Sequence, residues 1–378
     1  MAEVTGPRLI RLSKSCIGDA EKRAVMAVLD REHLGMGAAV QQFEEALGAY
    51  FGRPAVCVVN GTAALQLALQ AAGIGEEDEV LVPSLTYVAS FQAISATGAI
   101  PVACDIDAGS CTLNPSDLGQ RMSVRTKAIM PVHYAGGVGR LDEIYAFAGR
   151  HGLRVIEDAA HAFGTVHQGS PVGAKGDIAC FSFDGIKNIT SGEGGCIVTS
   201  DQEVLRRVRD ARLLGVENDT LARFSGARSW DFDVTAQGWR YHMSNLMAAI
   251  GHAQLSRRAE LAGRRQQLAA AYVRRLSNSP RIRPILSDFG AVVPHIFPVR
   301  IDGLADRNGL RSRMKDQGVE TGVHYRPNHT LSLYARHARA PLPVTESVYP
   351  ELLTLPLHPD LADDDIGHVV SILGQALS

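Results

Sequence analysis

Lys187 is the residue whose chemistry can be foreseen most directly. It follows the apolar run Phe181-Ser182-Phe183 and lies just before the glycine-rich segment Gly192–Gly195. Burial disfavours an ammonium ion, so a lysine in this setting loses its proton readily. A neutral amine can form a Schiff base with an aldehyde. The glycines let the chain turn tightly after the lysine, and a plain hairpin turn would use them in the same way.

A second segment, Asn60-Gly61-Thr62, is suited to binding a phosphate. It follows the apolar run 55–59 and opens a stretch of helical character. The free N–H groups and the dipole at a helix N-terminus favour an anion. Gly61 permits close approach of a ligand, and Thr62 adds a hydroxyl donor. Ser182 could donate to the same phosphate. An ordinary turn with a helix cap is the alternative interpretation of this segment.

Acidic residues end another apolar run, in the segment Ile156-Glu157-Asp158-Ala159-Ala160-His161. Ligands of parallel sheets bind at the carboxyl ends of the strands. A carboxylate at Asp158 could keep a pyridine nitrogen protonated, and the two alanines after it leave room for a flat ring. Capping of the next helix is the alternative role for this aspartate.

Tyr87 closes the segment Pro83-Ser84-Leu85-Thr86-Tyr87 and could stack on the face of such a ring. A place in the hydrophobic core is the alternative. One cofactor, pyridoxal 5'-phosphate (PLP), has all the parts that these residues could bind: an aldehyde for Lys187, a phosphate, a ring nitrogen and a flat aromatic face. These residues therefore predict a PLP enzyme in which Lys187 is the covalent residue.

Strand-like and helix-like runs alternate from about residue 38 to residue 250, and Gly or Pro marks most junctions. This alternation predicts an α/β fold with a mostly parallel central sheet between helices. The expected strands are Ala55–Val59, Glu79–Val82, Ile100–Asp105, Lys127–Val132 and Leu153–Glu157. The expected helices are Thr62–Ala72, Val88–Thr97 and Leu141–His151.

A smaller α+β domain is expected at the C-terminus, so we divide the chain into residues 1–250 and 251–378. A long helical stretch, Ser244–Ser277, leads from one domain to the other. Its basic run Arg264-Arg265-Gln266-Gln267 is interpreted as a solvated helix face. The remaining expected elements are the strands Ile296–Ile301 and Val319–Val323 and the helices Asp306–Gln317 and Asp364–Leu377.

Composition argues against several other classes of protein. The 378 residues carry a formal net charge of -2, which gives no electrostatic reason to expect binding to nucleic acid. No apolar run has the length of a membrane span, and residues 1–6 lack the pattern of a signal peptide. The six cysteines are scattered without a CxxC pair, so we expect no metal site and reduced thiols in a cytoplasmic protein.

Eight segments, in this order, resemble the DegT-type family of nucleotide-sugar aminotransferases, which are PLP enzymes of the aspartate aminotransferase fold (fold type I). The resemblance covers nearly the whole chain. The segments are Leu34–Gly37 with Phe43-Glu44, Asn60–Ala64, Pro83–Tyr87, Glu157–His161, Phe181–Phe183 with Lys187-Asn188, Gly192–Gly195, Met243–Asn245 and Gly322–Tyr325.

The resemblance implies a role for each matching residue. Lys187 would form the Schiff base and then carry the proton, while Asp158 would pair with the ring nitrogen. Tyr87 would stack on the ring, and His161 would contact the 3-hydroxyl group of the ring, where many members have Gln. The phosphate would be bound by Gly61, Thr62, Ala63 and Ser182.

The resemblance also implies a homodimer with active sites at the subunit interface. Many members carry an Asn that reaches the phosphate in the neighbouring subunit, and Arg240 takes that position here. Arginine can grip a phosphate with several donors, so the role could survive. An outward-facing Arg240 is the alternative. His242 stands where the family has Arg, and Asp184-Gly185-Ile186 also departs from the usual residues before the lysine.

The segment His324-Tyr325-Arg326 resembles the family's loop near the sugar. His324 and Tyr325 are candidate sugar contacts, with a structural hydrogen-bonding role as the alternative for each. Arg326 is a candidate for binding the carboxylate of the amino donor or the diphosphate of the nucleotide.

The expected activity is transfer of an amino group from glutamate, or less favourably glutamine, to a keto-deoxy nucleotide sugar in amino-sugar biosynthesis. A 4-keto-6-deoxy sugar is favoured because it is a widespread family substrate. A 3-keto sugar or a keto-cyclitol, in antibiotic or surface-polysaccharide biosynthesis, is the main alternative. Sugar dehydration is disfavoured because family dehydratases replace the Schiff-base lysine with His. A PLP-binding regulator without turnover is disfavoured because the chain lacks a basic excess and has no room before residue 38 for a DNA-binding domain.

Overall fold

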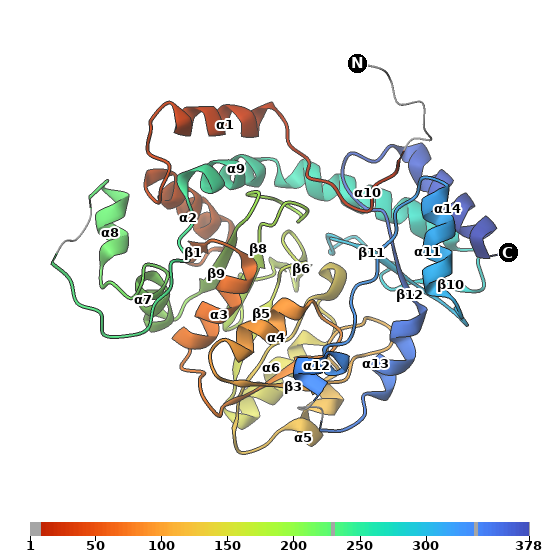
Figure 1. Cartoon of the computed structure of the whole chain (residues 1–378), viewed down its shortest axis with the longest axis horizontal. Helices are drawn as coiled ribbons and strands as arrows, with labels where there is room; N and C mark the ends of the chain where they lie inside the picture. Colours follow the sequence, from red (N-terminus) through yellow and green to blue (C-terminus); the bar gives the residue numbers. More distant parts are fainter. Residues whose placement is uncertain (1–8, 228–230, 336–338, 378) are drawn as a thin grey trace.

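The computed structural model describes residues 9–227, 231–335 and 339–377. Residues 1–6, which were expected not to form a signal peptide, lie outside the described residues. Figure 1 shows one large sheet wrapped by helices, with most of the C-terminal elements gathered at one side. Asp158 and Ser182 each end a strand of the large sheet, and Tyr87 follows another strand.

The large sheet has seven strands in the order β1-β9-β8-β5-β4-β2-β3. Strand β9 is antiparallel to both of its neighbours, and the other neighbouring pairs are parallel. This arrangement confirms the expected α/β fold. The strands are β1 (Ala55–Val58), β2 (Glu79–Pro83), β3 (Ile100–Cys104), β4 (Thr126–Ile129), β5 (Arg154–Asp158), β8 (Ile178–Ser182) and β9 (Gly195–Thr199).

Helices cover both faces of this sheet, which explains why its strands are apolar throughout. Side chains of α3 (Gly61–Ala71), α4 (Val88–Ser95) and α7 (Gln202–Ala211) share one core with alternate strand residues such as Val56 and Val58. The intervening residues Ala55 and Cys57 pack with α2 (Ala38–Phe51) and α9 (Asn245–Ser256) on the other face. There α6 (Leu141–His151) packs further along the sheet against β3, β4 and β5.

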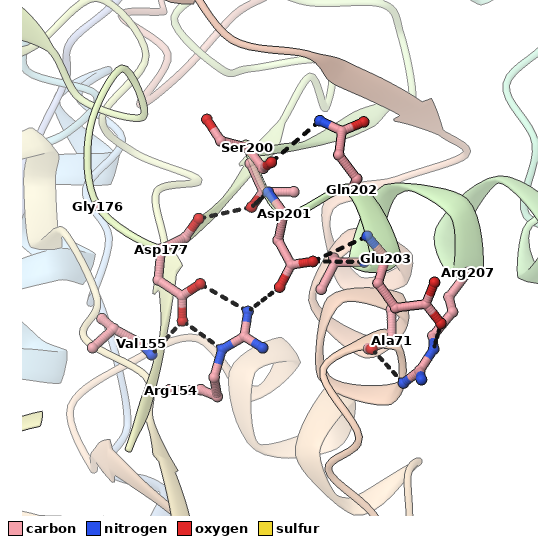
Figure 2. Close-up of polar contacts among 12 residues, drawn as sticks. Ala71, Arg154, Val155, Gly176, Asp177, Ser200, Asp201, Gln202, Glu203 and Arg207 are labelled. Carbon is pink, nitrogen blue, oxygen red and sulfur yellow. Dashed lines mark hydrogen bonds and ion pairs between the residues drawn. The ribbon is translucent and has the colours of Figure 1, made fainter. Parts of the chain in front are cut away.

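An ion-pair network lies at the amino end of β5, opposite the end that carries Asp158 (Figure 2). Arg154, the first residue of β5, donates to both carboxylate oxygens of Asp177 at 2.7 and 2.8 Å. It also donates to Asp201 at 3.2 Å. Asp201 caps α7 by accepting from the amides of Glu203 and Val204. Strands β5 and β8 and the helix after β9 are thereby fixed relative to one another.

The C-terminal part contains a three-stranded antiparallel sheet in the order β10-β11-β12. Its core includes Phe297 and Leu353 from the strands and Tyr272 from the long helix. Ile10 also belongs to this core and pairs with Val319. The elements are α10 (Arg258–Leu276), β10 (Ile282–Pro284), β11 (Phe297–Ile301), α11 (Arg307–Asp316), α12 (Ser332–Ala335), α13 (Pro343–Val348), β12 (Leu352–Leu355) and α14 (Asp363–Leu377).

Shorter elements complete the described chain. Helix α1 (Asp19–Leu29) packs on α9. The others are α5 (Leu118–Arg121), β6 (Val166–His167), β7 (Ser170–Pro171), α8 (Asp219–Phe224) and the 3-10 helices Pro115–Asp117, Tyr134–Gly136, Asn328–Thr330 and Tyr349–Glu351.

Three expectations for the C-terminal half need correction or refinement. Residues Val319–Val323 do not form a strand, because only Val319 and Gly322 make isolated bridges. The stretch 244–277 is two helices, α9 and α10, which meet at Arg257 with φ -94° and ψ 4°. Arg265 is not solvated, because only 2% of it is exposed. The proposed boundary between residues 250 and 251 falls inside α9, and the division into two domains remains a proposal.

The six cysteines are all free thiols, and five of them are buried. Across the described ranges, no group of three or more His, Cys, Asp or Glu side chains is placed to hold a metal ion. No helix among the described residues combines the length and the apolar character needed to cross a membrane.

Candidate active site

The predicted site residues meet around one cavity of about 490 Å³ at the carboxyl ends of β5 and β8. It is lined by Asn60, Gly61, Thr62, Leu65, Thr86, Tyr87, Ala89, Val132, Asp158, Ala160, His161, Ser182, Asp184, Ile186, Lys187, Glu193, His295, His324 and Tyr325. Nine of the predicted residues are in this set: Gly61, Thr62, Tyr87, Asp158, His161, Ser182, Lys187, His324 and Tyr325. The location agrees with the rule that open α/β sheets bind ligands at this edge.

Lys187 is half-buried in this cavity, in the turn that follows β8. Its amide donates to the carbonyl of Asp184 at 3.0 Å. Burial, the largest influence, lowers the pKa of Lys187 to about 8, although the carboxylates of Asp158 and Asp184 oppose the shift. The guanidinium of Arg265 lowers it further. The amine is therefore much easier to deprotonate than that of an exposed lysine.

Asp158 is the last residue of β5 and is held by two hydrogen bonds. Ser90 donates to one carboxylate oxygen at 2.6 Å, and the amide of Ala160 donates to the other at 3.2 Å. Only 6% of Asp158 is exposed. Because its partners come from α4 and from the residues after β5, the carboxylate has a fixed direction at the cavity wall.

The N-terminus of α3 lies against the end of β8. A Cβ added to Gly61 would lie 2.8 Å from Ser182 Cβ, so this close approach requires glycine. Asn60 caps α3 by accepting from the amide of Ala63 at 2.8 Å. The Ala63 amide is thus engaged by the cap, and Ala63 does not line the cavity within the described part of the chain. The N–H groups that precede Ala63 in the first turn of the helix have no intrahelical partner, because no helical carbonyl lies four residues before them.

Aromatic side chains and histidines form the remaining wall. Tyr87 is 57% exposed and its ring centroid lies 5.4 Å from that of Tyr325. Tyr325 Oη lies 3.0 Å from His161 Nε2. Burial first, and then the charge of Lys187, lowers the pKa of His161 well below its ordinary value. The same two causes lower the pKa of His324 to about 4. Both imidazoles are therefore neutral at pH 7.

Asn328 holds the loop that carries His324 and Tyr325 against the Tyr87 segment. Its side-chain amide donates to the carbonyls of Ser84 and Thr86 at 3.1 and 2.8 Å, and the residue is fully buried. This contact explains how residues from the C-terminal part come to line a cavity of the large sheet.

Two predicted residues lie elsewhere. Arg240 is exposed and its backbone bridges to Leu213. Arg326 is also exposed, and its guanidinium donates to the hydroxyl and carbonyl oxygens of Thr330. Within the described residues neither arginine lines the cavity.

Two contributors were not singled out from the sequence. His295 lies before β11 with no motif around it, and its Nε2 is 3.4 Å from Lys187 Nζ. In the sequence, Ser90 is an ordinary polar residue of an expected apolar helix, with no signal of a role in the site. Only the tertiary structure brings Ser90 to Asp158 and His295 to Lys187.

The cavity has the chemistry that PLP requires. Donors lie at the Gly61, Thr62 and Ser182 end, a fixed carboxylate lies at Asp158, and a readily deprotonated amine lies at Lys187. These groups match a phosphate, a ring nitrogen and an aldehyde, respectively. Glycine at position 61 lets the start of α3 lie directly against Ser182, so both residues line the same part of the cavity. Fold and site together define a PLP-dependent enzyme of fold type I.

Comparison with known proteins narrows this class. The sequence pattern of the DegT/DnrJ/EryC1/StrS aminotransferase family matches residues 15–374. The aminotransferase TlmJ from Streptoalloteichus hindustanus is 32% identical, with a TM-score of 0.90 over 98% of this chain and 99% of that one. Spr1654 from Streptococcus pneumoniae, solved in its PMP-form, is 29% identical, with a TM-score of 0.90 over 97% and 98%. DesI, solved in the presence of its TDP-sugar product, is 32% identical, with a TM-score of 0.87 over 97% and 92%.

The chain belongs to the DegT/DnrJ/EryC1/StrS aminotransferase family. It is an enzyme, a sugar aminotransferase that depends on PLP. This confirms the resemblance, the cofactor and the class of reaction inferred from the sequence motifs.

Proposed function

We propose that the enzyme transfers the amino group of glutamate to the ketone of a nucleotide-linked deoxysugar, with a 4-keto-6-deoxy sugar as the favoured substrate. The observation that carries this proposal is the pairing, in one cavity, of the Lys187 amine with the fixed carboxylate of Asp158. The TDP-sugar product of DesI supports a nucleotide-linked substrate.

The cofactor would be held by side chains from three places in the sheet. Gly61, Thr62 and Ser182 would bind the phosphate, with Ala63 contributing if its amide exchanges its Asn60 partner. Asp158 would accept a hydrogen bond from the protonated ring nitrogen, and Tyr87 would cover the ring face. The proposed contact of the ring hydroxyl is His161. When bound, PLP accepts the electron pair left at the carbon that loses a proton.

Lys187 would act as the covalent residue and as the general acid and base. Its free amine would take the proton from the α-carbon of glutamate and later deliver a proton to the sugar carbon that receives nitrogen. Glutamate leaves as 2-oxoglutarate, and the ketone becomes an amine. With a pKa of about 8, roughly a tenth of the free amine is neutral at pH 7, which is far more than for an ordinary lysine.

A homodimer would complete the site. Among the described residues that line the cavity, Lys187 is the only Lys or Arg. A phosphate and a nucleotide diphosphate both favour guanidinium partners. We therefore propose that Arg240, exposed in one chain, binds the phosphate in the neighbouring subunit, and that Arg326 binds the donor carboxylate or the diphosphate.

His324 and Tyr325 are the proposed sugar contacts, because both line the cavity on a loop fixed by Asn328. We also propose a cytoplasmic location, where six free thiols would stay reduced.

The test is a coupled assay with glutamate and a panel of ketones that includes 4-keto-6-deoxy nucleotide sugars, 3-keto nucleotide sugars and a keto-cyclitol. Release of 2-oxoglutarate is measured, and NMR identifies the carbon that carries the new amine. We expect turnover with a 4-keto-6-deoxy nucleotide sugar and none with the Lys187→Ala variant. Turnover restricted to the 3-keto sugar or the cyclitol would contradict the proposed substrate.

A further inference from the structure

Lys187 has a close neighbour from a distant part of the chain. His295 Nε2 lies 3.4 Å from Lys187 Nζ, and the histidine is only 3% exposed. The two residues are 108 positions apart in the sequence. His295 precedes β11 of the C-terminal sheet, whereas Lys187 follows β8 of the large sheet. The cavity thus brings the lysine of one sheet to an imidazole carried by the other.

The backbone fixes this approach from both sides. Arg265 donates to the carbonyl of His295 at 3.0 Å, and its second terminal nitrogen donates to the carbonyls of Ile186 and Lys187 at 3.3 and 3.5 Å. The amide of His295 donates to the carbonyl of Ala135 at 3.2 Å. One buried guanidinium therefore ties the two segments together, and the separation of the two side chains is set by the scaffold.

The surroundings keep the imidazole neutral. Burial first, and then the positive charge of Lys187, lowers the pKa of His295 well below its ordinary value. The His161 ring lies beside it, with ring centroids 4.4 Å apart and the ring planes tilted by 49°. The charged or titratable groups that act on the pair are Asp158, Asp184, His161, Arg265 and His324.

A neutral imidazole has one accepting nitrogen. The protonated form of Lys187 has three N–H donors and no acceptor, so a hydrogen bond between the pair requires His295 Nε2 to accept. The neutral amine can donate in the same direction and keep its lone pair free for a proton. His295 Nδ1 makes no hydrogen bond to the described residues.

We propose that His295 is a positioning residue for Lys187: its imidazole accepts a hydrogen bond from the free amine and holds that amine in the cavity between proton transfers. The inference rests on the role proposed above for Lys187. A lysine side chain has four rotatable carbons, so an unheld amine would sample directions away from the reacting carbon. Holding it contributes to catalysis by orientation.

Three substitutions separate positioning from packing. His295→Leu removes the acceptor and retains an apolar side chain. His295→Gln can place an amide oxygen near the position of Nε2. His295→Asn carries an amide too, but its side chain ends about one bond short, near the position of Nδ1. A role in positioning therefore predicts that Gln, and not Asn or Leu, restores the wild-type behaviour.

The first readout needs no bound cofactor. The full-length protein, freed of PLP, is reductively methylated with formaldehyde across a pH series, and mass spectrometry follows the peptide that contains Lys187. The wild-type midpoint is expected near the pKa of about 8. His295→Leu is expected to lower that midpoint by about one unit, because the ammonium loses its acceptor. His295→Gln is expected to remain close to wild type.

The second readout is the single-turnover rate of amino transfer, measured above that midpoint. His295→Leu and His295→Asn are expected to lose about tenfold in the maximal rate, with little change in the half-saturating substrate concentration, and His295→Gln to recover most of the rate. Unchanged midpoint and rate in His295→Leu would overturn the inference. Equal losses in the Gln, Asn and Leu variants would also overturn it, because they would indicate packing alone. If His295→Leu does not fold, the comparison of Gln with Asn decides.

Failure of the inference can be told apart from failure of the proposed function. Borohydride reduction of the wild-type enzyme should fix the cofactor to Lys187. If it does, and the His295 variants behave like wild type, only the positioning role is rejected. If the wild-type lysine is not labelled, the role proposed for Lys187 itself is rejected.

Discussion

Ser90 Oγ donates a hydrogen bond of 2.6 Å to Asp158 Oδ2, and Thr86 Oγ1 lies 2.8 Å from the same serine oxygen. All three residues are buried. The first turn of α4, next to Tyr87, therefore sets the direction of the acid that is proposed to face the ring nitrogen. A pair of hydroxyl groups links the aromatic wall of the cavity to its carboxylate.

Ser90→Ala should weaken this arrangement without removing the acid. A buried carboxylate that loses a donor costs about 1–3 kcal/mol, so we expect a lower unfolding free energy and faster loss of PLP on dialysis. Chemical unfolding and the visible absorption of the bound cofactor measure these two effects. Thr86→Val, which breaks only the second hydrogen bond, is the control and should have a smaller effect. Normal cofactor retention in Ser90→Ala would contradict the role assigned to this hydrogen bond.

Asp158→Asn should preserve the fold and remove the charge. The amide oxygen can still accept from Ser90, but the NH2 group cannot accept from the Ala160 amide, so we expect only a small drop in the thermal midpoint. Without a carboxylate to stabilise the protonated ring, kcat should fall by about 100-fold or more. Steady-state kinetics and thermal unfolding, run in parallel, check this. Activity within a few-fold of wild type would show that Asp158 does not face the ring nitrogen.

Lys187→Met should stabilise the protein in the absence of cofactor. The pKa of Lys187, about 8 when folded, lies below its ordinary value of 10.5, so the unfolded chain binds the proton more tightly. The lowered pKa therefore reduces the free energy of unfolding. The reduction is fully present below about pH 8 and disappears as the pH rises toward 10.5. Its removal should add up to about 3 kcal/mol at pH 7 and little near pH 11. Urea unfolding at both pH values tests this, with exposed Lys175→Met as the control. Equal gains at the two pH values would rule out a buried ammonium as the cause.

Arg240→Ala should weaken PLP retention without unfolding the protein or separating the proposed dimer. The arginine is exposed in the single chain, so its loss removes no buried contact. Equilibrium dialysis measures retention, and analytical ultracentrifugation measures association. The exposed Arg274 on α10 provides a matched substitution, Arg274→Ala, that should change neither quantity. Unchanged affinity for PLP in Arg240→Ala would reject the contribution proposed across the interface.

Local sequence signals predicted most of the large sheet and the residues that gather at its edge. Val56, Val80 and Ile156 lie in short apolar runs, because strands covered on both faces need apolar residues throughout. The Val319–Val323 segment has a valine at each end but Glu, Thr and Gly between them, and it forms only isolated bridges at Val319 and Gly322. The β-branched residues of this segment suggested a strand, but a local pattern could not indicate that the segment lacks a continuous partner strand.

The site residues that the sequence did not reveal are placed by contacts between distant parts of the chain. Arg265 looked like one member of a solvated basic run, but it is buried and binds the carbonyls beside His295 and Lys187. His295 itself has no motif, since its role depends on a lysine 108 positions away. Ser90 lies inside the predicted helix Val88–Thr97, but only the packing of α4 on the sheet brings it to Asp158.

The proposed function depends most on Lys187 as the residue that binds the cofactor, and one measurement tests this role directly. The chain has six lysines, at positions 14, 22, 127, 175, 187 and 315. The purified enzyme with PLP is reduced with borohydride, digested and analysed by mass spectrometry. We expect a pyridoxyl-phosphate adduct on the peptide that contains Lys187 and on no other peptide, and loss of that adduct in Lys187→Ala. An adduct on another lysine, or one that persists in the variant, would contradict it.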